Sequence, residues 1–559
     1  MTMSPPEFAE WDLSVDVVIA GTGAAALSGA LTAALHGLFP LVVEKAGVWG
    51  GTTAWSGGGV WVPVNSMMAA AGMQDSPEDA MSYLDATVGE VGPASSPERK
   101  RAYIDSARAM VDLFAQEGFQ WDLGAHYPDY HFEFPSARIG RMLEGTPFDV
   151  NRLGPWADTL RQRETFAWVP IKTDEISRAV HTAHSVSGLL TSARLMARLG
   201  SARLRGRRLA SMGGSLVAQL MFLIQRRGVP VWLNSPLEDL IVEDDRVVGA
   251  VVKRGDRTMR VRAEHGVLLG VGGFSRNDEI RRRYHDFGAS WSSTIAEDQG
   301  DGLEIGTKAG AATAFLDDAF WVPMLFPPGS PPVTALWERG QPGAIMVDST
   351  GQRFVNEAAS YKDVALTMLD RAKKSPGQRT WLIVDSTHRR KYPFGMAPPG
   401  YTPRRWLKDE FIIKTSTLDE IARRCNIDPA ALRASVQRFN GLVDQGKDTD
   451  FGRGDTVYDN YYGDPHNKPN PNLGPVAKAP FYAAEIHPGD IGSCGGLLTD
   501  ENARVLREDG SVILGLYAAG NTTATVMGHR YPGPGSTIGP AATFGYVAMR
   551  HAATDSRRT

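Results

Sequence analysis

The chain has 559 residues, of which 42% are hydrophobic and 22% are charged, and its formal net charge at pH 7 is −4. Its length predicts two domains, since single hydrophobic cores stop growing near ~250–300 residues. The modest charge gives no sign of nucleic-acid binding. Two cysteines, Cys425 and Cys494, without a C-x-x-C motif exclude a disulfide framework and fit a reducing cytoplasm.

Membrane spans and targeting segments are not expected. No run of 18 apolar residues occurs, so the sequence predicts no transmembrane helix. The N-terminus is acidic, with Glu7, Glu10 and Asp12, and lacks the basic region and apolar stretch of a signal peptide. We therefore expect a cytoplasmic protein.

The first predicted elements are a strand, a helix and a second strand. The apolar run 15–20 predicts a buried parallel strand, and a helix follows it as far as Ala34. The run 41–43 predicts the next strand, which ends at Glu44. This order is typical of a dinucleotide-binding unit.

The turn between the first strand and the helix carries a glycine pattern that suits a pyrophosphate. Gly21 permits the tight turn, and Gly23 lets the backbone approach phosphate at the helix N-terminus. Ala25 follows, and Ala26 stands where the third glycine is usual. Glu44 lies about 20 residues further on, where a carboxylate binds an adenosine ribose.

Later segments favour FAD over NAD as the cofactor. A loop of small residues over 50–59 could wrap a ribityl chain and pyrophosphate, and 266–274 and 514–521 read as strands that close beside the cofactor. The further residues expected to bind the cofactor are Lys45, Gly51, Thr52, Thr53, Ser56, Gly57, Gly58, Gly59, Leu237, Gly272, Gly273, Asp301, Gly520 and Asn521.

The domain organisation is predicted to be discontinuous. Residues 237–252 suggest a hairpin with its turn at Asp244 and Asp245. Dinucleotide-binding elements recur after the segment 320–493, which is rich in Pro and Trp, and the end of the chain from His551 is expected to fray. We expect an α/β fold in which a Rossmann-like FAD domain receives an inserted α+β substrate domain. The predicted boundaries are 1–319 and 494–559 for the FAD domain and 320–493 for the inserted domain.

A Pro- and Gly-rich run over 531–540 is where the sequence suggests chemistry. The Tyr531 hydroxyl and the Gly535 amide could converge on one carbonyl oxygen, as in an oxyanion hole. Thr537 and Ile538 follow directly and are expected at the cofactor.

Together these motifs resemble the fumarate reductase and ketosteroid dehydrogenase superfamily of flavoproteins, and most closely the 3-ketosteroid Δ1-dehydrogenases. The stretches that carry the closer resemblance are 531–539, 353–361, 128–130 and 495–500. The resemblance implies that Tyr531 and Gly535 bind the steroid C3 carbonyl. It implies that Tyr361 takes the C2 proton, that hydride from C1 passes to flavin N5, and that Tyr130, or Tyr127 in its place, supports Tyr361.

The resemblance also sets the cofactor and partners. Some relatives link the flavin to a histidine in the N-terminal loop, but no His lies between His36 and His126, so we expect non-covalent FAD. The expected partners are a 3-keto-4-ene steroid, with or without its side chain, and an artificial or quinone-type electron acceptor. No metal is expected. Because a phenol has a pKa near 10, Tyr361 would need neighbours that lower its pKa or relay its proton.

Three other functions stay open. A 3-ketosteroid 4-ene (5α) dehydrogenase would use similar parts. A dicarboxylate oxidoreductase would need Arg and His to grip carboxylates; Arg353 is one such residue, but the apolar run 320–326 better suits a flat apolar ligand. A lipid-escort scaffold without redox chemistry would not need the intact cofactor loop.

An extra segment, 152–211, separates the N-terminal motifs from the predicted return to the main fold. Between Ile176 and Leu237 there are nine arginines and no Asp or Glu, and leucines recur at helical spacing over 185–208. A basic amphipathic helix can lie on anionic lipid at the inner face of a membrane. A helix packed on the protein, or an oligomer contact, is the equal alternative.

Overall fold

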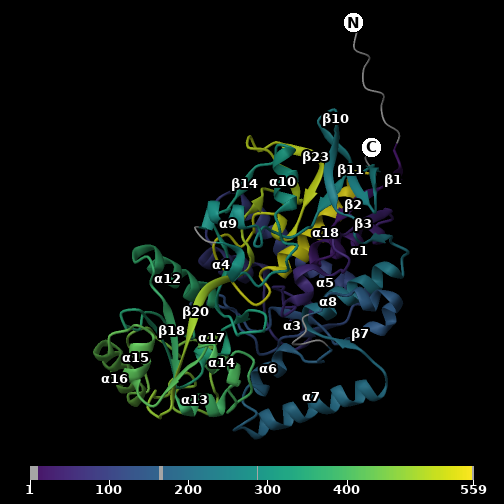
Figure 1. Cartoon of the computed structure of the whole chain (residues 1–559). Coiled ribbons are helices and arrows are strands. Elements are labelled where there is room, and N and C mark those ends of the chain that lie inside the picture. The colour runs from purple at the N-terminus through teal and green to yellow at the C-terminus, as the bar shows by residue number, and fades with distance from the viewer. Residues whose placement is uncertain (1–10, 163–167, 286–287, 557–559) are drawn as a thin grey trace.

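The computed structural model describes residues 11–162, 168–285 and 288–556, and its architecture is mixed α/β (Figure 1). A large sheet with a parallel centre lies at one end of the molecule, and a smaller antiparallel sheet lies at the other. Chain segments from both ends of the sequence build the first sheet. The expected acidic N-terminus, Glu7 and Glu10, and part of the extra segment, 163–167, fall outside the described residues.

The first sheet has the dinucleotide-binding arrangement that the sequence predicts. Its parallel centre runs in the order β23 (Val512–Ala518), β13 (Val267–Leu269), β2 (Val17–Ala20) and β3 (Pro40–Val43). Helices cover these strands, which explains their continuous apolar sequences. The remaining strands of this sheet are β1 (Leu13–Val15), β9 (Val231–Trp232), β10 (Leu237–Glu243), β11 (Arg246–Arg254), β12 (Arg257–Ala263) and β22 (Arg504–Leu506).

The predicted hairpin is confirmed. β10 and β11 pair antiparallel around Asp244 and Asp245, whose φ angles of 47° and 61° are left-handed. Asp tolerates this conformation better than most residues, so the turn matches its sequence.

Three helices pack tightly behind the sheet. α1 (Ala24–Leu35) lies against α18 (Ile538–Asp555) and α8 (Met212–Gln225). The contact between α1 and α18 requires glycine, because a β-carbon on Gly545 would lie 2.1 Å from the Ala25 carbonyl oxygen. The prediction that the chain frays from His551 is wrong, since α18 continues to Asp555 and buries Ala552 on its inner face.

The second sheet is antiparallel and is built from the middle of the chain. Its two longest strands, β15 (Ala319–Leu325) and β20 (Phe481–Ser493), pair with each other. Its other strands are β16 (Val333–Thr334), β17 (Ala344–Asp348), β18 (Thr380–Val384) and β19 (Ile413–Thr415). The helices after β16 and before β20 are α11 (Trp337–Gly340), α12 (Tyr361–Lys374), α13 (Ser386–Lys391), α14 (Arg404–Lys408), α15 (Leu418–Arg424), α16 (Pro429–Asp444) and α17 (Val457–Tyr461).

The remaining elements belong to neither of these two sheets. They include α2 (Gly51–Trp55) in the glycine-rich loop and α10 (Asp301–Lys308). The others are β4 (Val60–Trp61), α3 (Ser66–Ala70), α4 (Pro77–Thr87), η1 (Pro93–Ser95), α5 (Pro97–Gln116), β5 (Trp121–Leu123), β6 (Met142–Gly145), β7 (Phe148–Asp149), β8 (Leu209–Ala210), α9 (Asp278–His285), η4 (Ala289–Trp291), β14 (Thr313–Ala314), β21 (Gly496–Leu497) and η5 (Gly520–Thr522).

The extra segment contains two α-helices after a 3-10 stretch, η2 (Val150–Thr159). The short helix α6 (Thr173–Ala179) packs on the long helix α7 (Val186–Leu204), which lies along the lower edge of the molecule in Figure 1. The helical spacing predicted over 185–208 is confirmed. Among the described residues no helix is long and apolar enough to cross a membrane.

Candidate active site

One cavity of about 380 Å³ reaches from the turn after β2 to a cluster of tyrosines beside the second sheet. Its walls come from both sheets and from the extra segment. The predicted cofactor-binding residues that line it are Gly21, Gly23, Ala25, Glu44, Lys45, Gly51, Thr52, Thr53, Ser56, Gly57, Gly58, Gly59, Leu237, Gly272, Asp301, Gly520, Asn521, Gly535, Thr537 and Ile538. The cavity also reaches Tyr130, Tyr361 and Tyr531.

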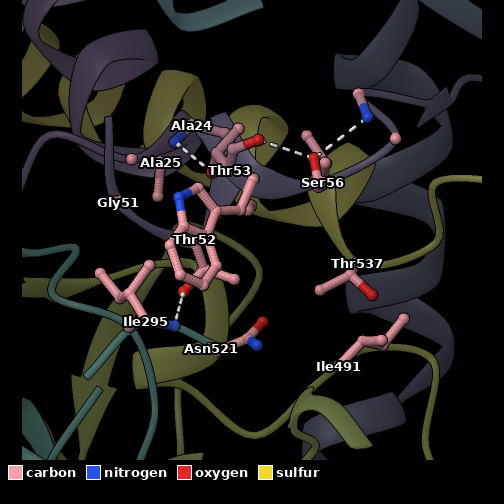
Figure 2. A pocket seen from close by; sticks show the side chains of 18 of the residues that line it. Ala24, Ala25, Gly51, Thr52, Thr53, Ser56, Ile295, Ile491, Asn521 and Thr537 are labelled. Carbon is pink, nitrogen blue, oxygen red and sulfur yellow. Dashed lines mark hydrogen bonds between the residues drawn. The ribbon is translucent and has the colours of Figure 1, made fainter. Parts of the chain in front are cut away.

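The glycine-rich loop is fixed against the first turn of α1 by side-chain hydrogen bonds (Figure 2). The Thr53 hydroxyl accepts from the Ala24 amide at 3.1 Å. The Ser56 hydroxyl donates to the Thr53 carbonyl at 2.7 Å and accepts from the Gly58 amide at 3.0 Å. These bonds shape the loop into a cradle beside the helix N-terminus, where anions bind favourably.

Two glycines at the turn meet different demands. Gly21 has a φ of +100°, and a β-carbon on it would lie 2.3 Å from the Gly270 carbonyl oxygen, so only glycine fits. Gly23 has extended backbone, and a β-carbon there would meet only the Thr53 hydroxyl, at 3.4 Å. The bare face of Gly23 therefore leaves room for a ligand at the start of α1.

Carboxylates lie where the sequence predicts contacts to the cofactor. Glu44 ends β3 and is buried; its oxygens accept from the Thr22 hydroxyl at 2.6 Å and from the Ala46 amide at 2.9 Å. Burial raises the pKa of Glu44, and these hydrogen bonds oppose the shift. Lys45 and Asp301 form an ion pair at 2.6 Å in the cavity wall.

Two predicted cofactor residues do not line the cavity. Ala26 faces the sheet. A β-carbon built on Gly270 would lie 3.2 Å from the β-carbon of Ala26, so helix α1 packs closely on the strand that Gly270 follows. Gly273 donates its amide to the Asp298 carboxylate at 2.6 Å. Asp298 itself lines the cavity, and burial raises its pKa to about 6. The rest of the cradle fits a dinucleotide with an extended linker, as FAD has.

Three phenols meet at the other end of the cavity. The ring centroid of Tyr361 lies 5.1 Å from that of Tyr531 and 5.3 Å from that of Tyr130, and Tyr130 stacks on Tyr531 at 5.5 Å. The Tyr130 hydroxyl lies 3.4 Å from that of Tyr127, which is hydrogen-bonded in turn to Tyr462. Tyr127 and Tyr130 both line the cavity, so their hydroxyls lie side by side in its wall.

The electrostatics of this cluster differ from one sequence-based expectation. Burial raises the pKa of Tyr361 and of Tyr130 well above 10, and neighbouring phenols raise them further. The neighbouring phenols therefore do not lower the pKa of Tyr361, and the first of the two alternatives set out from the sequence finds no support in this arrangement. Burial also raises the pKa of Tyr531, although hydrogen bonds with Thr537 and Tyr361 oppose the shift. All three phenols are neutral near pH 7, and only the proton-relay alternative remains for Tyr361.

Gly535 lines the same cavity as Tyr531. Its φ is +93°, and a β-carbon would lie 2.3 Å from the Gly59 carbonyl oxygen, so glycine is required. Its carbonyl accepts from the amides of Trp61 and Gly539, at 3.3 and 2.8 Å. Within the described part of the chain, no acceptor is found for the Gly535 N–H, which leaves it available to a ligand.

Arg353 does not reach the cavity. It forms a bidentate ion pair with Glu357 and a second ion pair with Asp448, all three side chains being buried. The pair fixes the segment that leads to Tyr361. Among the described residues that line the cavity there is no arginine or histidine, and the one lysine, Lys45, is paired with Asp301.

Sequence reasoning missed several residues that line the cavity. Tyr461, Tyr462, Trp337, Leu336 and Ile491 line it, as do Trp55, Met142, Met212 and Val322. The only hint in the sequence was the adjacent pair Tyr461 and Tyr462. Nothing in the sequence of 457–462 indicated that this pair would lie beside residues about 300 positions earlier in the chain. Val322 belongs to the apolar run predicted to suit a flat ligand.

Comparisons with known proteins agree with this geometry. The FAD binding domain family matches residues 16–538. The 3-oxosteroid 1-dehydrogenase of Mycolicibacterium smegmatis is 41% identical over 95% of this chain and 96% of that protein. The 4-oxocyclohex-2-ene-1-carboxylate 5-dehydrogenase of Sinomonas cyclohexanicum is 35% identical over 97% of this chain and 94% of that protein.

A solved structure shares the whole architecture. The 3-ketosteroid Δ1-dehydrogenase of Sterolibacterium denitrificans, solved with 1,4-androstadiene-3,17-dione, superposes with a TM-score of 0.92 at 38% identity, covering 97% of this chain and 100% of that one. Motifs, fold and cavity thus point the same way as the sequence identity, and the chain belongs to the 3-ketosteroid Δ1-dehydrogenase family of FAD-binding proteins.

Proposed function

We propose that this protein is an FAD-dependent oxidoreductase that desaturates ring A of 3-ketosteroids between C1 and C2, with FAD held non-covalently. The observation that carries the proposal is that Tyr130, Tyr361 and Tyr531 form one buried cluster and line, with Gly535, the same cavity as the cofactor-binding residues. The 41% identity to 3-oxosteroid 1-dehydrogenases supports the same reaction and substrate class.

Tyr531 and Gly535 polarise the substrate carbonyl. A neutral phenol and a backbone N–H can both donate a hydrogen bond to a carbonyl oxygen. Burial raises the pKa of Tyr531, which keeps its phenol neutral. No acceptor among the described residues occupies the Gly535 N–H. Thr537 donates to the Tyr531 oxygen at 3.2 Å, so the phenol O–H is directed elsewhere. Donors aimed at the C3 oxygen stabilise the enolate that develops as C2 loses its proton.

Tyr361 accepts the C2 proton and must pass on its own, because its raised pKa keeps it protonated. We assign the next step to Tyr130, whose ring packs edge-on against that of Tyr361 with the centroids 5.3 Å apart. The hydroxyls of Tyr127 and Tyr462 extend the chain. Because every phenol in this chain starts neutral, each one that accepts a proton must give up its own. The last phenol must therefore release a proton, and we propose that water reached through the cavity accepts it.

The cofactor end of the cavity completes the site. Bound FAD supplies the acceptor for the hydride from C1. The cradle of Gly23, Thr53 and Ser56 would hold its pyrophosphate and ribityl chain, and Glu44 would bind its ribose. Val322, Leu336 and Ile491 exclude water around the substrate.

The other functions find less support. A dicarboxylate needs cationic side chains around it, but no arginine or histidine is found among the described cavity residues and Arg353 is buried elsewhere. The same argument disfavours the carboxylated cyclohexenone on which the 35% identical relative acts, according to its name. Desaturation of 5α-steroids at C4–C5 is the second candidate, because the same tyrosines, the Gly535 amide and a flavin could also carry out that reaction.

Product analysis tests the proposal. Purified holoprotein is incubated with a 4-ene-3-ketosteroid and an artificial dye or a quinone as the electron acceptor, and the product is identified by mass and NMR. The expected product is the 1,4-diene, two hydrogens lighter. A 4-ene formed from a 5α-steroid, with no reaction of the 4-ene itself, would favour the second candidate.

A further inference from the structure

A buried lysine follows Tyr361 directly on α12, and the proposed reaction does not use it. Lys362 is 1% exposed, and it is not among the described residues that line the cavity. Lysine is almost never buried completely unless its charge is paired. Its ammonium group therefore needs a partner inside the protein, and that partner comes from another part of the chain.

Asp318 supplies the opposite charge. Lys362 Nζ donates to an Asp318 carboxylate oxygen at 2.9 Å and lies 3.3 Å from the Cys494 sulfur. Burial raises the pKa of the Cys494 thiol well above its usual value, so the thiol is neutral and Asp318 is the counter-charge. Burial also opposes ionisation of Asp318, but the charge of Lys362 and hydrogen bonds from His529 and Lys362 bring its pKa below its usual value.

The Asp318 carboxylate is held in place by the antiparallel sheet. Asp318 directly precedes β15, and its second oxygen accepts from the Trp321 indole N–H and from the Ala319 amide, each at 2.8 Å. Its carbonyl oxygen accepts from the Cys494 amide at 3.1 Å, next to the end of β20. The ion pair therefore attaches the first turn of α12 to the sheet.

The same carboxylate also reaches the segment that carries Tyr531. His529 lies two residues before Tyr531, and its Nδ1 lies 2.9 Å from the oxygen that Lys362 binds. A carboxylate only accepts hydrogen bonds, so the imidazole donates this one. The Phe320 ring centroid lies 5.6 Å from Lys362 Nζ and 5.5 Å from the ring centroid of Tyr531, which it meets edge-on. Asp318 thus connects the sequence neighbours of two tyrosines that the proposed reaction uses.

We propose that Lys362 and Asp318 are positioning residues, whose ion pair holds the hydroxyl of Tyr361 at its working distance from that of Tyr531. Neither side chain would touch the substrate, because neither is among the described residues that line the cavity. Displacement of a reacting group by about 1 Å can lower a rate by about 10²-fold. The placement of the tyrosines does not depend on which reaction occurs, whereas the expected loss of rate rests on the proposed function.

Fluorine NMR tests the placement without using activity. Holoprotein is labelled with 3-fluorotyrosine, and the resonances of Tyr361 and Tyr531 are assigned with the Y361F and Y531F variants. Lys362→Met should shift both resonances, because it keeps an apolar stem and removes the charge that Asp318 holds. The double variant D318N/K362M should shift them too, and it leaves no unpaired buried charge that could prevent folding.

Lys100→Met is the matched control. Lys100 is also buried, but its ammonium group donates to Asp85 at 3.1 Å and to the Gly89 carbonyl at 2.7 Å, and it joins other segments of the chain. This variant should leave the resonances of Tyr361 and Tyr531 where they are in the unaltered protein.

Deuterated steroids measure the effect on the reaction, with rates expressed per bound flavin. K362M should lower kcat per flavin by at least ~10-fold. It should raise the isotope effect at C2 and reduce the one at C1, because proton transfer to Tyr361 becomes the slower step. A general loss of folded protein would lower the flavin content and leave both isotope effects unchanged.

The outcomes separate this proposal from the proposed function. Positioning is overturned if the Tyr361 and Tyr531 resonances of K362M and D318N/K362M coincide with those of the unaltered protein. It is also overturned if K362M turns over the steroid with unchanged isotope effects. Shifted resonances in a protein that does not oxidise a 4-ene-3-ketosteroid would support the placement of Tyr361 by Lys362 and reject the proposed function alone.

Discussion

The ring centroids of Tyr361 and Tyr531 lie 5.1 Å apart, although Tyr361 opens helix α12 of the middle segment and Tyr531 lies in the loop between η5 and α18. Their hydroxyls interact, and this contact raises the pKa of Tyr361 while it lowers that of Tyr531. The proposed proton acceptor and the proposed carbonyl donor thus come from distant parts of the chain. The reaction centre is formed only when the two parts of the molecule are assembled.

Tyr361→Phe should remove the group that we propose accepts the C2 proton. We expect kcat to fall by at least ~10³-fold, within the range for loss of an acid–base group, while FAD stays bound. Steady-state rates with a 4-ene-3-ketosteroid and the visible flavin spectrum measure both effects.

Tyr458→Phe is the matched control for that variant. Tyr458 belongs to the same buried cluster, with its ring centroid 4.7 Å from that of Tyr130, but it does not line the cavity and its hydroxyl finds no partner among the described residues. Near-normal turnover is expected. Equal losses in the Tyr361 and Tyr458 variants would mean that packing, not proton transfer, explains the effect.

Tyr531→Phe should weaken carbonyl polarisation and leave proton transfer in place. By comparison with loss of one oxyanion donor, kcat should fall by about 10²–10³-fold. A substrate deuterated at C2 should show a larger isotope effect in this variant, because enolate formation becomes slower. An unchanged rate would show that Tyr531 does not contact the carbonyl.

Gly535→Ala should be damaging through geometry. Alanine at position 535 would be strained by the backbone φ of +93°, and its β-carbon would lie 2.3 Å from the Gly59 carbonyl oxygen. The loop beside the cofactor would therefore have to shift. We expect loss of activity and of bound flavin. Gly510→Ala controls for strain alone, since Gly510 has a φ of +81° with no atom within 4 Å; its flavin content should be normal.

Gly23→Val should fill the phosphate cradle. Gly23 has ordinary extended backbone, so valine is not strained there, but its side chain would occupy the space at the start of α1. We expect FAD affinity to fall by at least ~10-fold, measured by flavin fluorescence on dilution, with the fold retained by circular dichroism. Gly441→Val, on an open face of α16, should bind FAD normally; retention of FAD by both variants would contradict the assignment.

Glu144 should make stability depend on pH. Burial raises its pKa from 4.5 to about 7, against hydrogen bonds from Thr173. Because the folded state then binds its proton more tightly, the free energy of unfolding should fall as pH rises from about 4.5 to about 7, by roughly 3 kcal/mol. Below that window the effect vanishes, since both states are protonated.

Glu144→Gln should remove this pH dependence. Urea unfolding in excess FAD at pH 4.5 and pH 8 should show the variant gaining stability relative to the unaltered protein at pH 8 only. The exposed Glu279→Gln variant serves as the control, with no such change. An equal difference at both pH values would show that Glu144 is ionised throughout.

The sequence predicted the first sheet well because its signals are local. The strand 17–20, the turn at Gly21 and the helix after it follow directly along the chain, and each residue's role depends on its neighbours. The hairpin with its turn at Asp244 was also predicted from adjacent residues in the sequence. The end of α18 was mistaken because its last turn is stabilised by burial of Ala552, which no local pattern reveals.

The catalytic cluster could be predicted only in part. Tyr361, Tyr531 and Gly535 were reached through motifs, but the surrounding shell of Tyr461, Tyr462 and Trp337 comes from elements joined only by tertiary folding. The electrostatics were predicted least well. Burial dominates the pKa of Tyr361, and burial is a property of the assembled cavity.

The central claim is that the tyrosine end of this cavity desaturates a 3-ketosteroid while the cofactor end accepts the electrons. The most direct measurement is an anaerobic titration of the holoprotein with a 4-ene-3-ketosteroid, followed by the visible spectrum and by NMR of the product. We predict bleaching of the oxidised flavin band, with one equivalent of the 1,4-diene formed per flavin reduced. A yellow protein whose flavin band persists in excess steroid would contradict the account.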